Sequence, residues 1–235
     1  MPPPIPDEMP TVASKPFRSL WDAAVLGHRE AMSQLATRAA QSVYAWLRAN
    51  GLLAEEADVR TDHFFARLLS CDPPNPNEED VERYQEFLQR RLAAYVAAGL
   101  PDADAQAMQL RPFFDRAQAE RRFLRETQRH PDDVLTRRWA LGALELTIET
   151  LKEEFTNDGK AVLVPYLQQF LSFSGGEERY GEVATKTGTS VSALHVAVFR
   201  YRQRYRELLR RLVGDTVRNQ AEVDSELTKL LVAAS

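Results

Sequence analysis

The second half of the chain alternates apolar and polar residues with the period of an α-helix. Between Tyr180 and Arg211 the sequence reads YGEVATKTGTSVSALHVAVFRYRQRYRELLRR, and it predicts two helices separated by a break at Gly188. Glycine lacks the Cβ that makes a left-handed backbone costly, so it suits the end of the first helix. Ser190 suits the N-cap of the second, because its hydroxyl can accept a hydrogen bond from an unpaired backbone N–H. This pattern predicts a helix-turn-helix.

The second of these helices has an apolar stripe and a set of arginines outside it. The apolar residues recur at alternating steps of three and four: Val191, Leu194, Val198, Tyr201, Tyr205, Leu208 and Leu212. The arginines are expected in solvent or against phosphates, interrupted only by Glu207: Arg200, Arg202, Arg204, Arg206, Arg210 and Arg211. Such a cluster suits the neutralisation of a nucleic-acid backbone and predicts salt-dependent binding. A solvated basic face on an ordinary helical domain is the alternative.

The same kind of pattern predicts the organisation of the rest of the chain. Residues 1–16 are rich in proline, which predicts a disordered N-terminal tail. Residues 17–98 predict one helical domain. Prolines and charged residues interrupt the pattern over 99–133, which predicts a linker. A second helical domain is expected over 134–213, with a C-terminal extension helix over 214–235.

Composition and charge agree with this organisation. The 235 residues are 44% hydrophobic, which is ample for packed cores. Few glycines and few β-branched runs favour an all-α fold of two domains, the second containing the helix-turn-helix. The formal net charge is −4, yet residues 180–235 hold nine Lys or Arg against six Asp or Glu, so this end is +3 and the remainder −7. An acidic N-terminal part and a basic C-terminal part indicate two surfaces with different partners.

The expected compartment follows from cysteine usage and from the N-terminus. Cys71 is the only cysteine, so no intrachain disulfide can form, which fits a reducing cytosol. The opening MPPPIPDEMP has no basic n-region and no apolar h-region, unlike a signal peptide. No apolar run approaches the length of a membrane span. We therefore expect a cytoplasmic protein without a membrane partner.

No pattern typical of catalysis or metal binding emerges. The four histidines are scattered, without a second His or Cys at metal-ligand spacing, so neither a metal nor a cofactor is expected. His63 has the pattern of an ordinary surface histidine. Neighbouring carboxylates such as Glu153 and Glu154 point apart on a helix and are expected to be solvated. No Ser/His/Asp or Cys/His arrangement is evident, and we expect a protein that is not an enzyme.

Three segments, in the family's order, resemble bacterial sigma factors of the extracytoplasmic-function type. The closest likeness is to the long variant that has a C-terminal extension, and it covers about residues 17–235. Ser42–Leu69, from SVYAWLRANG through EEADVRTDHFFARLL, resembles region two, whose helices dock on the polymerase clamp. Arg137–Leu171, followed by the segment that begins at Tyr180, resembles region four. The closing TVRNQAEVDSELTKLLVAAS resembles the tail of that variant.

This resemblance implies a protein that binds core RNA polymerase and directs promoter-specific transcription initiation. An anti-sigma or other regulatory protein is a further partner that it implies. Region four would lay its second helix in the major groove of double-stranded promoter DNA. The DNA-binding residues would be Ser190, Val191, Ser192, His195, Val196, Phe199, Arg200, Arg202 and Arg204. The residues that bind core polymerase would be Glu56, Asp58, Asp62, Phe64 and Phe65.

Departures from the family leave two alternatives open. Leu92–Leu110 contains no Lys or Arg, and Tyr95 is its only aromatic residue. The family has there a basic, aromatic stretch that captures unstacked promoter bases. One alternative is therefore a divergent sigma-like regulator or adaptor that binds proteins and has lost minus-ten recognition, with Val196 and Phe199 as a protein contact patch. The other is a helix-turn-helix repressor that acts without polymerase.

Overall fold

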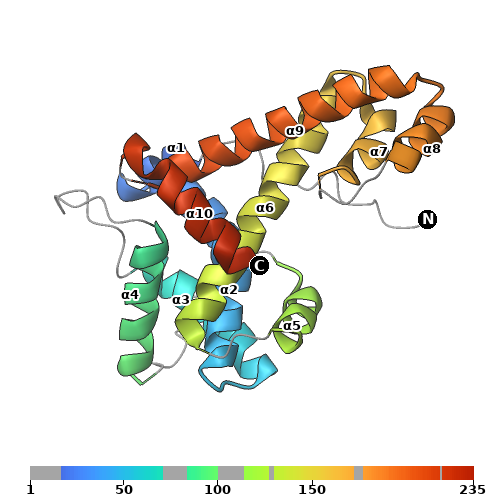
Figure 1. Ribbon diagram of the computed structural model, residues 1–235. Helices are drawn as coiled ribbons and strands as arrows, with labels where there is room; N and C mark the ends of the chain where they lie inside the picture. Colours follow the sequence, from blue (N-terminus) through green and yellow to red (C-terminus); the bar gives the residue numbers. More distant parts are fainter. Residues whose placement is uncertain (1–16, 71–83, 100–113, 127–129, 172–176, 218) are drawn as a thin grey trace, which may run out of the picture. The chain divides into compact units, whose positions relative to one another are not determined.

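The protein is all-α. The computed structural model describes residues 17–70, 84–99, 114–126, 130–171, 177–217 and 219–235. These residues form α-helices and short 3-10 helices and contain no β-strand (Figure 1). The expected N-terminal tail, Cys71 and most of Leu92–Leu110 lie outside the described residues.

Contacts between residues divide the chain into two compact units. Unit 1 comprises Met1–Gly142 and Asp215–Ser235, and unit 2 comprises Ala143–Gly214. This division differs from the sequence prediction, in which the second domain spans residues 134–213 and the C-terminal helix over 214–235 extends it. Helix α6 (Pro131–Asn157) passes through the division without a break, so the sequence pattern offers no boundary there.

Packing explains why both the start of α6 and the C-terminal helix belong to unit 1. Val134 and Leu135 in the first turn of α6 are buried, and Leu135 belongs to the same apolar core as α2. Arg137 of α6 donates a hydrogen bond to the carbonyl oxygen of Ala233 at 3.3 Å. These long-range contacts, rather than a local signal, decide the division.

Unit 1 is built around one central helix. Its elements are α1 (Phe17–Val25), α2 (Arg29–Ala49), α3 (Ala54–Ser70), α4 (Tyr84–Ala97), α5 (Arg116–Leu124), the start of α6, η4 (Gln220–Glu222) and α10 (Val223–Ala234). Every residue of α2 from Ser42 to Leu47 is buried. A helix that is buried on all sides belongs in the middle of a core. Packing of α1, α3 and α5 against α2 provides that burial.

Residues Thr61 to Ala66 of α3 are all buried as well. Phe64 is 3% exposed and Phe65 is 0% exposed, and both belong to the core of unit 1. His63 is also buried, and its Nδ1 lies 2.7 Å from the hydroxyl oxygen of Tyr95 on α4. The interpretation of His63 as a surface histidine was wrong, because α4 supplies a buried hydrogen-bond partner from 32 positions away.

Part of the expected linker is a packed helix. Helix α5 begins after Asp115, whose carboxylate accepts a hydrogen bond from the backbone N–H of Gln118 at 2.8 Å. Such an N-cap satisfies a backbone donor that the helix itself leaves unpaired. Ala119 in α5 and Phe114 just before it are buried in the core of unit 1. Within the described residues, this stretch therefore belongs to unit 1 and does not act as a spacer.

Unit 2 consists of the end of α6 and the helices that follow it. These are η3 (Ala161–Leu163), α7 (Val164–Gln168), α8 (Glu177–Thr187) and α9 (Val191–Gly214). Figure 1 shows α7 and α8 beside the first half of α9. Their shared core contains Tyr201, which is 0% exposed and meets the ring of Phe155 edge-on at 4.9 Å. The expected apolar stripe of α9 supplies Leu194, Val198, Tyr201 and Leu208 to this core.

Candidate functional site

A three-residue turn of defined geometry joins α8 to α9. Gly188 has φ +64°, the left-handed conformation that ends a helix at least cost in glycine. The backbone N–H of Thr189 donates to the carbonyl of Ala184 at 3.0 Å. The hydroxyl of Ser190 accepts from the backbone N–H of Ala193 at 3.1 Å, which confirms Ser190 as the N-cap. Local chemistry therefore fixes where α9 begins.

Replacing Ser190 by alanine is expected to cost about 1 kcal/mol in the opening of α9, because the N-cap bond is lost. Amide hydrogen exchange in the first turns of α9 should then become about fivefold faster, as 1.4 kcal/mol corresponds to a factor of ten. Ser190→Asn keeps a capping oxygen and should exchange as the wild type does. Ser192→Ala removes a nearby exposed serine that does not cap, and an equal effect of this variant would disprove the assignment.

His195 is exposed, and its ring also lies against α8. Its ring stacks on Tyr180 with centroids 3.9 Å apart and planes 12° from parallel. Tyr180 is 8% exposed and in turn packs on Phe170 at 4.4 Å. His195 therefore joins α8 to α9 while it remains exposed, and its role in DNA binding stays a prediction.

The outer face of α9 carries one continuous exposed stripe, which we call the outer stripe. Its members follow at alternating steps of four and three: Ser192, Val196, Phe199, Gln203 and Arg206. Val196 is 48% exposed and Phe199 is 65% exposed, and Val191 at the helix start is 44% exposed. Arg200 is exposed and lies beside the stripe. Two of the five members of the outer stripe are thus apolar, which is unusual for the exposed side of a helix.

The arginines of α9 divide into two groups. Arg202 donates to the carbonyl of Phe170 at 2.7 Å. Arg204 binds the carboxylate of Glu154 on α6 through two hydrogen bonds of 2.7 Å. These hydrogen bonds raise the pKa of the Arg204 guanidinium above its ordinary value. Arg202 and Arg204 were predicted as DNA contacts, and both are used inside unit 2.

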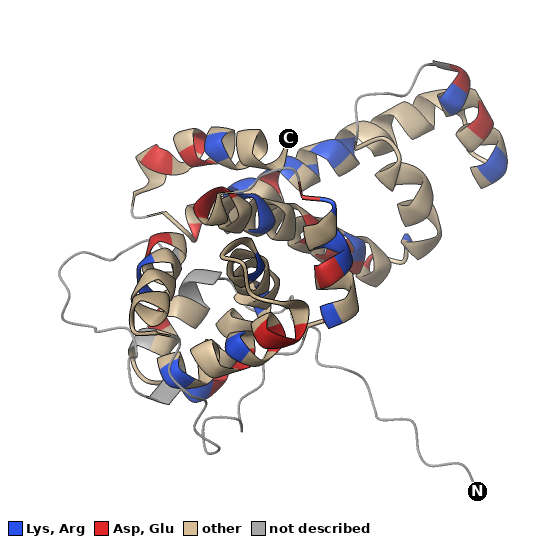
Figure 2. Ribbon diagram, turned by 90° about the horizontal axis from the view of Figure 1, so that it is seen from below, with Lys and Arg blue, Asp and Glu red and all other residues tan. Residues whose placement is uncertain are grey.

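The remaining arginines of α9 stay at the surface: Arg200, Arg206, Arg210 and Arg211. The neighbouring α8 carries both signs of charge (Figure 2), with exposed Glu178 and Glu182 as well as exposed Lys186. Positive charge suited to a polyanion is therefore concentrated on α9 itself.

The residues predicted to bind polymerase are only partly at the surface. Glu56 is exposed, and the Asp58 side chain is 34% exposed. The Asp62 side chain is 4% exposed, and both of its oxygens accept hydrogen bonds from Arg116 Nη2, at 3.1 and 3.0 Å. Phe64 and Phe65 are in the core, as described above. As folded here, Glu56 and Asp58 remain accessible and the two phenylalanines do not.

A second polar cluster joins α5 to α2. The Glu120 carboxylate accepts hydrogen bonds from Arg48 Nη2 at 2.9 Å and Nε at 3.0 Å, and from the hydroxyl of Tyr44 at 2.6 Å. The hydrogen bond with Arg48 is the main reason that the pKa of Glu120 lies below its ordinary value. Burial, followed by the bond to Glu120, raises the pKa of Tyr44. This cluster is absent from the sequence prediction because Glu120 is more than 70 positions from both of its partners.

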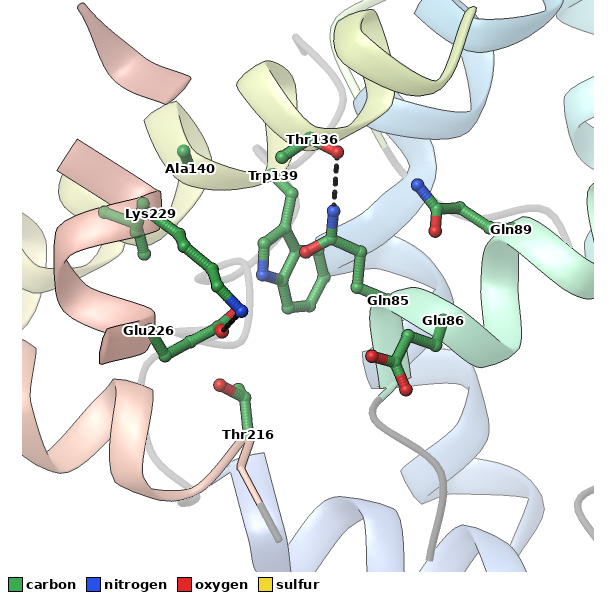
Figure 3. A pocket seen from close by; sticks show the side chains of 10 residues that line it. Gln85, Glu86, Gln89, Thr136, Trp139, Ala140, Thr216, Glu226 and Lys229 are labelled. Carbon is green, nitrogen blue, oxygen red and sulfur yellow. Dashed lines mark hydrogen bonds and ion pairs between the residues drawn. The ribbon is translucent and has the colours of Figure 1, made fainter. Parts of the chain in front are cut away.

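One cavity of about 210 Å³ lies within unit 1 (Figure 3). Trp139 of α6 is one of the residues that line it, and the amide of Gln85 donates to the Thr136 hydroxyl at 2.8 Å. Glu226 and Lys229 of α10 form an ion pair at 3.7 Å on another side. No residue from the predicted DNA or polymerase sets lines this cavity.

Two further observations concern only the part of the chain that the structure describes. No helix there is both long and apolar enough to cross a membrane. No group of three or more His, Cys, Asp or Glu side chains there is placed to hold a metal ion.

In comparisons with known proteins, the chain matches no family model, no curated protein and no solved structure. The functional assignment therefore depends on its own residues and their arrangement.

Proposed function

We propose that this chain is a transcription protein of the sigma-factor kind, which contacts promoter DNA through α9 and core RNA polymerase through α3. The observation that carries the proposal is the arrangement of α8, the turn at 188–190 and α9. A short helix, a three-residue turn and a longer helix with an exposed outer face are consistent with a helix-turn-helix, a motif whose second helix enters the major groove.

The residues on the exposed face of α9 suit this role. Ser192 lies in the first turn, where the second helix of such a motif meets base edges. Its hydroxyl can hydrogen-bond to bases or phosphate, while Val196 and Phe199 can contact thymine methyl groups. Arg200 and Arg206 are exposed and can neutralise phosphates. Promoter selection would thus combine apolar base contacts with phosphate neutralisation.

Acidic residues on α3 suit a basic surface of the polymerase. Glu56 and Asp58 lie in the first half of α3 at exposed and half-exposed positions. Complementary charge speeds association and sets orientation. A protein of this kind is not an enzyme, needs no cofactor of its own and works in the cytoplasm, which its single cysteine suits.

The DNA contact is tested by comparing arginines of the two groups. Replacing Arg200 and Arg206 together by alanine should weaken DNA binding and lower the slope of log affinity against log salt by about 2, since each phosphate contact contributes about 0.9. Arg204→Ala is the matched control: Arg204 is bound to Glu154, so its loss should leave the slope unchanged. Equal slopes for the wild type and the double variant would exclude phosphate contact by this face.

The sigma function is tested by reconstituted transcription with core polymerase on genomic fragments. Transcripts that start at defined positions only when the chain is added would support the proposal. Binding to core polymerase without initiation would instead favour the divergent regulator. Binding to DNA without any affinity for core polymerase would favour a repressor.

One observation favours the divergent regulator as a second candidate. Val196 and Phe199 form an exposed apolar pair where a DNA-reading helix more often carries polar side chains. In that case Val196→Ser with Phe199→Ser should abolish binding to a protein partner and leave DNA affinity intact. Loss of DNA affinity in this variant would support base contact instead.

A further inference from the structure

Helix α5 binds two of the three acidic residues of α3 that were predicted to meet polymerase, Asp58 and Asp62. Arg116, the first residue of α5, lies between Asp58 and Asp62 and hydrogen-bonds to both carboxylates. One guanidinium nitrogen, Nη2, reaches both oxygens of Asp62, at 3.0 and 3.1 Å. A cationic side chain of a partner protein would have to bind the same carboxylate oxygens of Asp58 and Asp62.

The rest of α5 is held by polar contacts as well. Glu120 binds Arg48 and Tyr44 of α2, and Arg122 Nη1 donates to the side-chain oxygen of Gln41 at 3.0 Å. The Arg48 and Glu120 side chains are 16% and 24% exposed, so this ion pair is only partly shielded from water. The contact between α5 and α2 thus depends on charged groups that a competing surface can replace.

Phe114, just before α5, is buried in the core, but within α5 itself little apolar surface reinforces these contacts. Ala119 is the one residue of α5 that is fully buried. The ring of Phe123 lies 4.9 Å from the Arg48 guanidinium and is only partly buried. A helix of nine residues is marginal in water by itself. Helix α5 should therefore stay folded while docked and lose its order when displaced.

One end of α5 is fixed more firmly. Glu126, two residues beyond the helix, is buried and pairs with Arg137 at 2.9 Å and with Arg138 at 2.6 Å on α6. Arg138 also donates to the carbonyl of Arg122 at 2.6 Å. Displacement of α5 would leave this anchor in place, so that the helix can return.

We propose that α5 is an internal competitor of the polymerase: it occupies the acidic face of α3 in the free chain, and a cationic partner surface must displace it. Arg116 acts as a stand-in for the partner's own Arg or Lys, because a cationic side chain forms charge-assisted hydrogen bonds to these carboxylates. This inference rests on the proposed function of α3. The affinity observed for polymerase is then the intrinsic affinity reduced by the fraction of chains whose α5 is displaced.

The test reverses one ion pair without touching the proposed docking acids. Glu120→Arg places two arginines opposite each other and should free α5, which hydrogen exchange at the amides of 116–124 would report as loss of protection. The same variant should lower the Kd for core polymerase on the order of tenfold, within the usual range of coupling between sites. Arg48→Glu combined with Glu120→Arg restores an ion pair in the opposite direction, and should return both exchange and Kd toward wild-type values.

Controls separate release of α5 from simple changes in charge or folding. Glu30→Arg alters net charge equally at an exposed position at the start of α2 and should change neither measurement. Helical circular dichroism and tryptophan emission must stay as in the wild type for each variant. Rescue by the charge swap also shows that Glu120→Arg acts through this ion pair rather than by unfolding.

Each outcome has one meaning. Free α5 with an unchanged Kd would show that α5 does not compete, although the chain still binds polymerase. Unchanged exchange in Glu120→Arg would show that this pair does not hold α5, which also contradicts the inference. If neither the wild type nor any variant binds core polymerase, the proposed function itself fails, and the competition falls with it.

Discussion

Phe65→Ala is expected to lower the free energy of unfolding of unit 1 by about 4 kcal/mol, because removal of a buried aromatic ring leaves a cavity. Phe65 is 0% exposed in the core of unit 1. All three tryptophans, Trp21, Trp46 and Trp139, belong to unit 1, so emission excited at the tryptophan edge reports on this unit alone. The measurement is urea unfolding followed by that emission.

The control for this prediction lies on the same helix. Val59 is 46% exposed on α3, and Val59→Ala should change the free energy of unfolding by no more than about 0.5 kcal/mol. Polymerase docking by Phe65 would give the opposite pattern, with unchanged stability and a large loss of affinity for polymerase. The pair of variants thus decides whether Phe65 acts through the core or through a contact.

Glu126→Ala is expected to cost about 3 kcal/mol of unit 1 stability, because it leaves two arginines without the buried charge that they face. The Glu126 side chain is 1% exposed, whereas those of Arg137 and Arg138 are 23% and 10% exposed. Burial lowers the pKa of Arg138, and Glu126 opposes that effect. Removal of the carboxylate therefore removes the main compensation for a buried cation. Tryptophan emission during urea unfolding again gives the measurement.

Two further variants make this result specific. Glu126→Gln keeps the shape and one hydrogen-bond acceptor, so it should lose less stability than Glu126→Ala. Glu30 is an exposed glutamate of α2 within unit 1, and Glu30→Ala should stay within about 0.5 kcal/mol of the wild type. A cost for Glu126→Ala that equals the cost for Glu30→Ala would mean that the ion pairs contribute nothing to unit 1.

The candidate DNA site shows where a local prediction reaches its limit. The turn was predictable because a glycine in the left-handed conformation and a serine N-cap act within four residues of each other. Which arginines of α9 face solvent and which are bound within unit 2 was not predictable. Arg204 meets Glu154 across 50 positions, and nothing in the spacing of the arginines distinguishes Arg204 from Arg200.

Tertiary contacts changed the candidate polymerase site more. Periodicity alone identifies Phe64 and Phe65 as the apolar end of a helix, but an apolar end can serve a core or a partner equally well. Packing against α2 and α4 buried these rings, and Arg116 covered Asp62. The proline-rich pattern around α5 predicted a spacer, whereas three sets of polar contacts dock this helix on unit 1.

The sequence by itself determined the all-α class, the apolar stripe of α9 and the turn between α8 and α9, because periodicity and capping act between near neighbours in the chain. The tertiary structure alone decided which charges face water, where the two units divide and which helix covers the acidic face of α3. Those outcomes depend on pairs of groups 50 or more positions apart, whose burial and partners exist only once the helices pack.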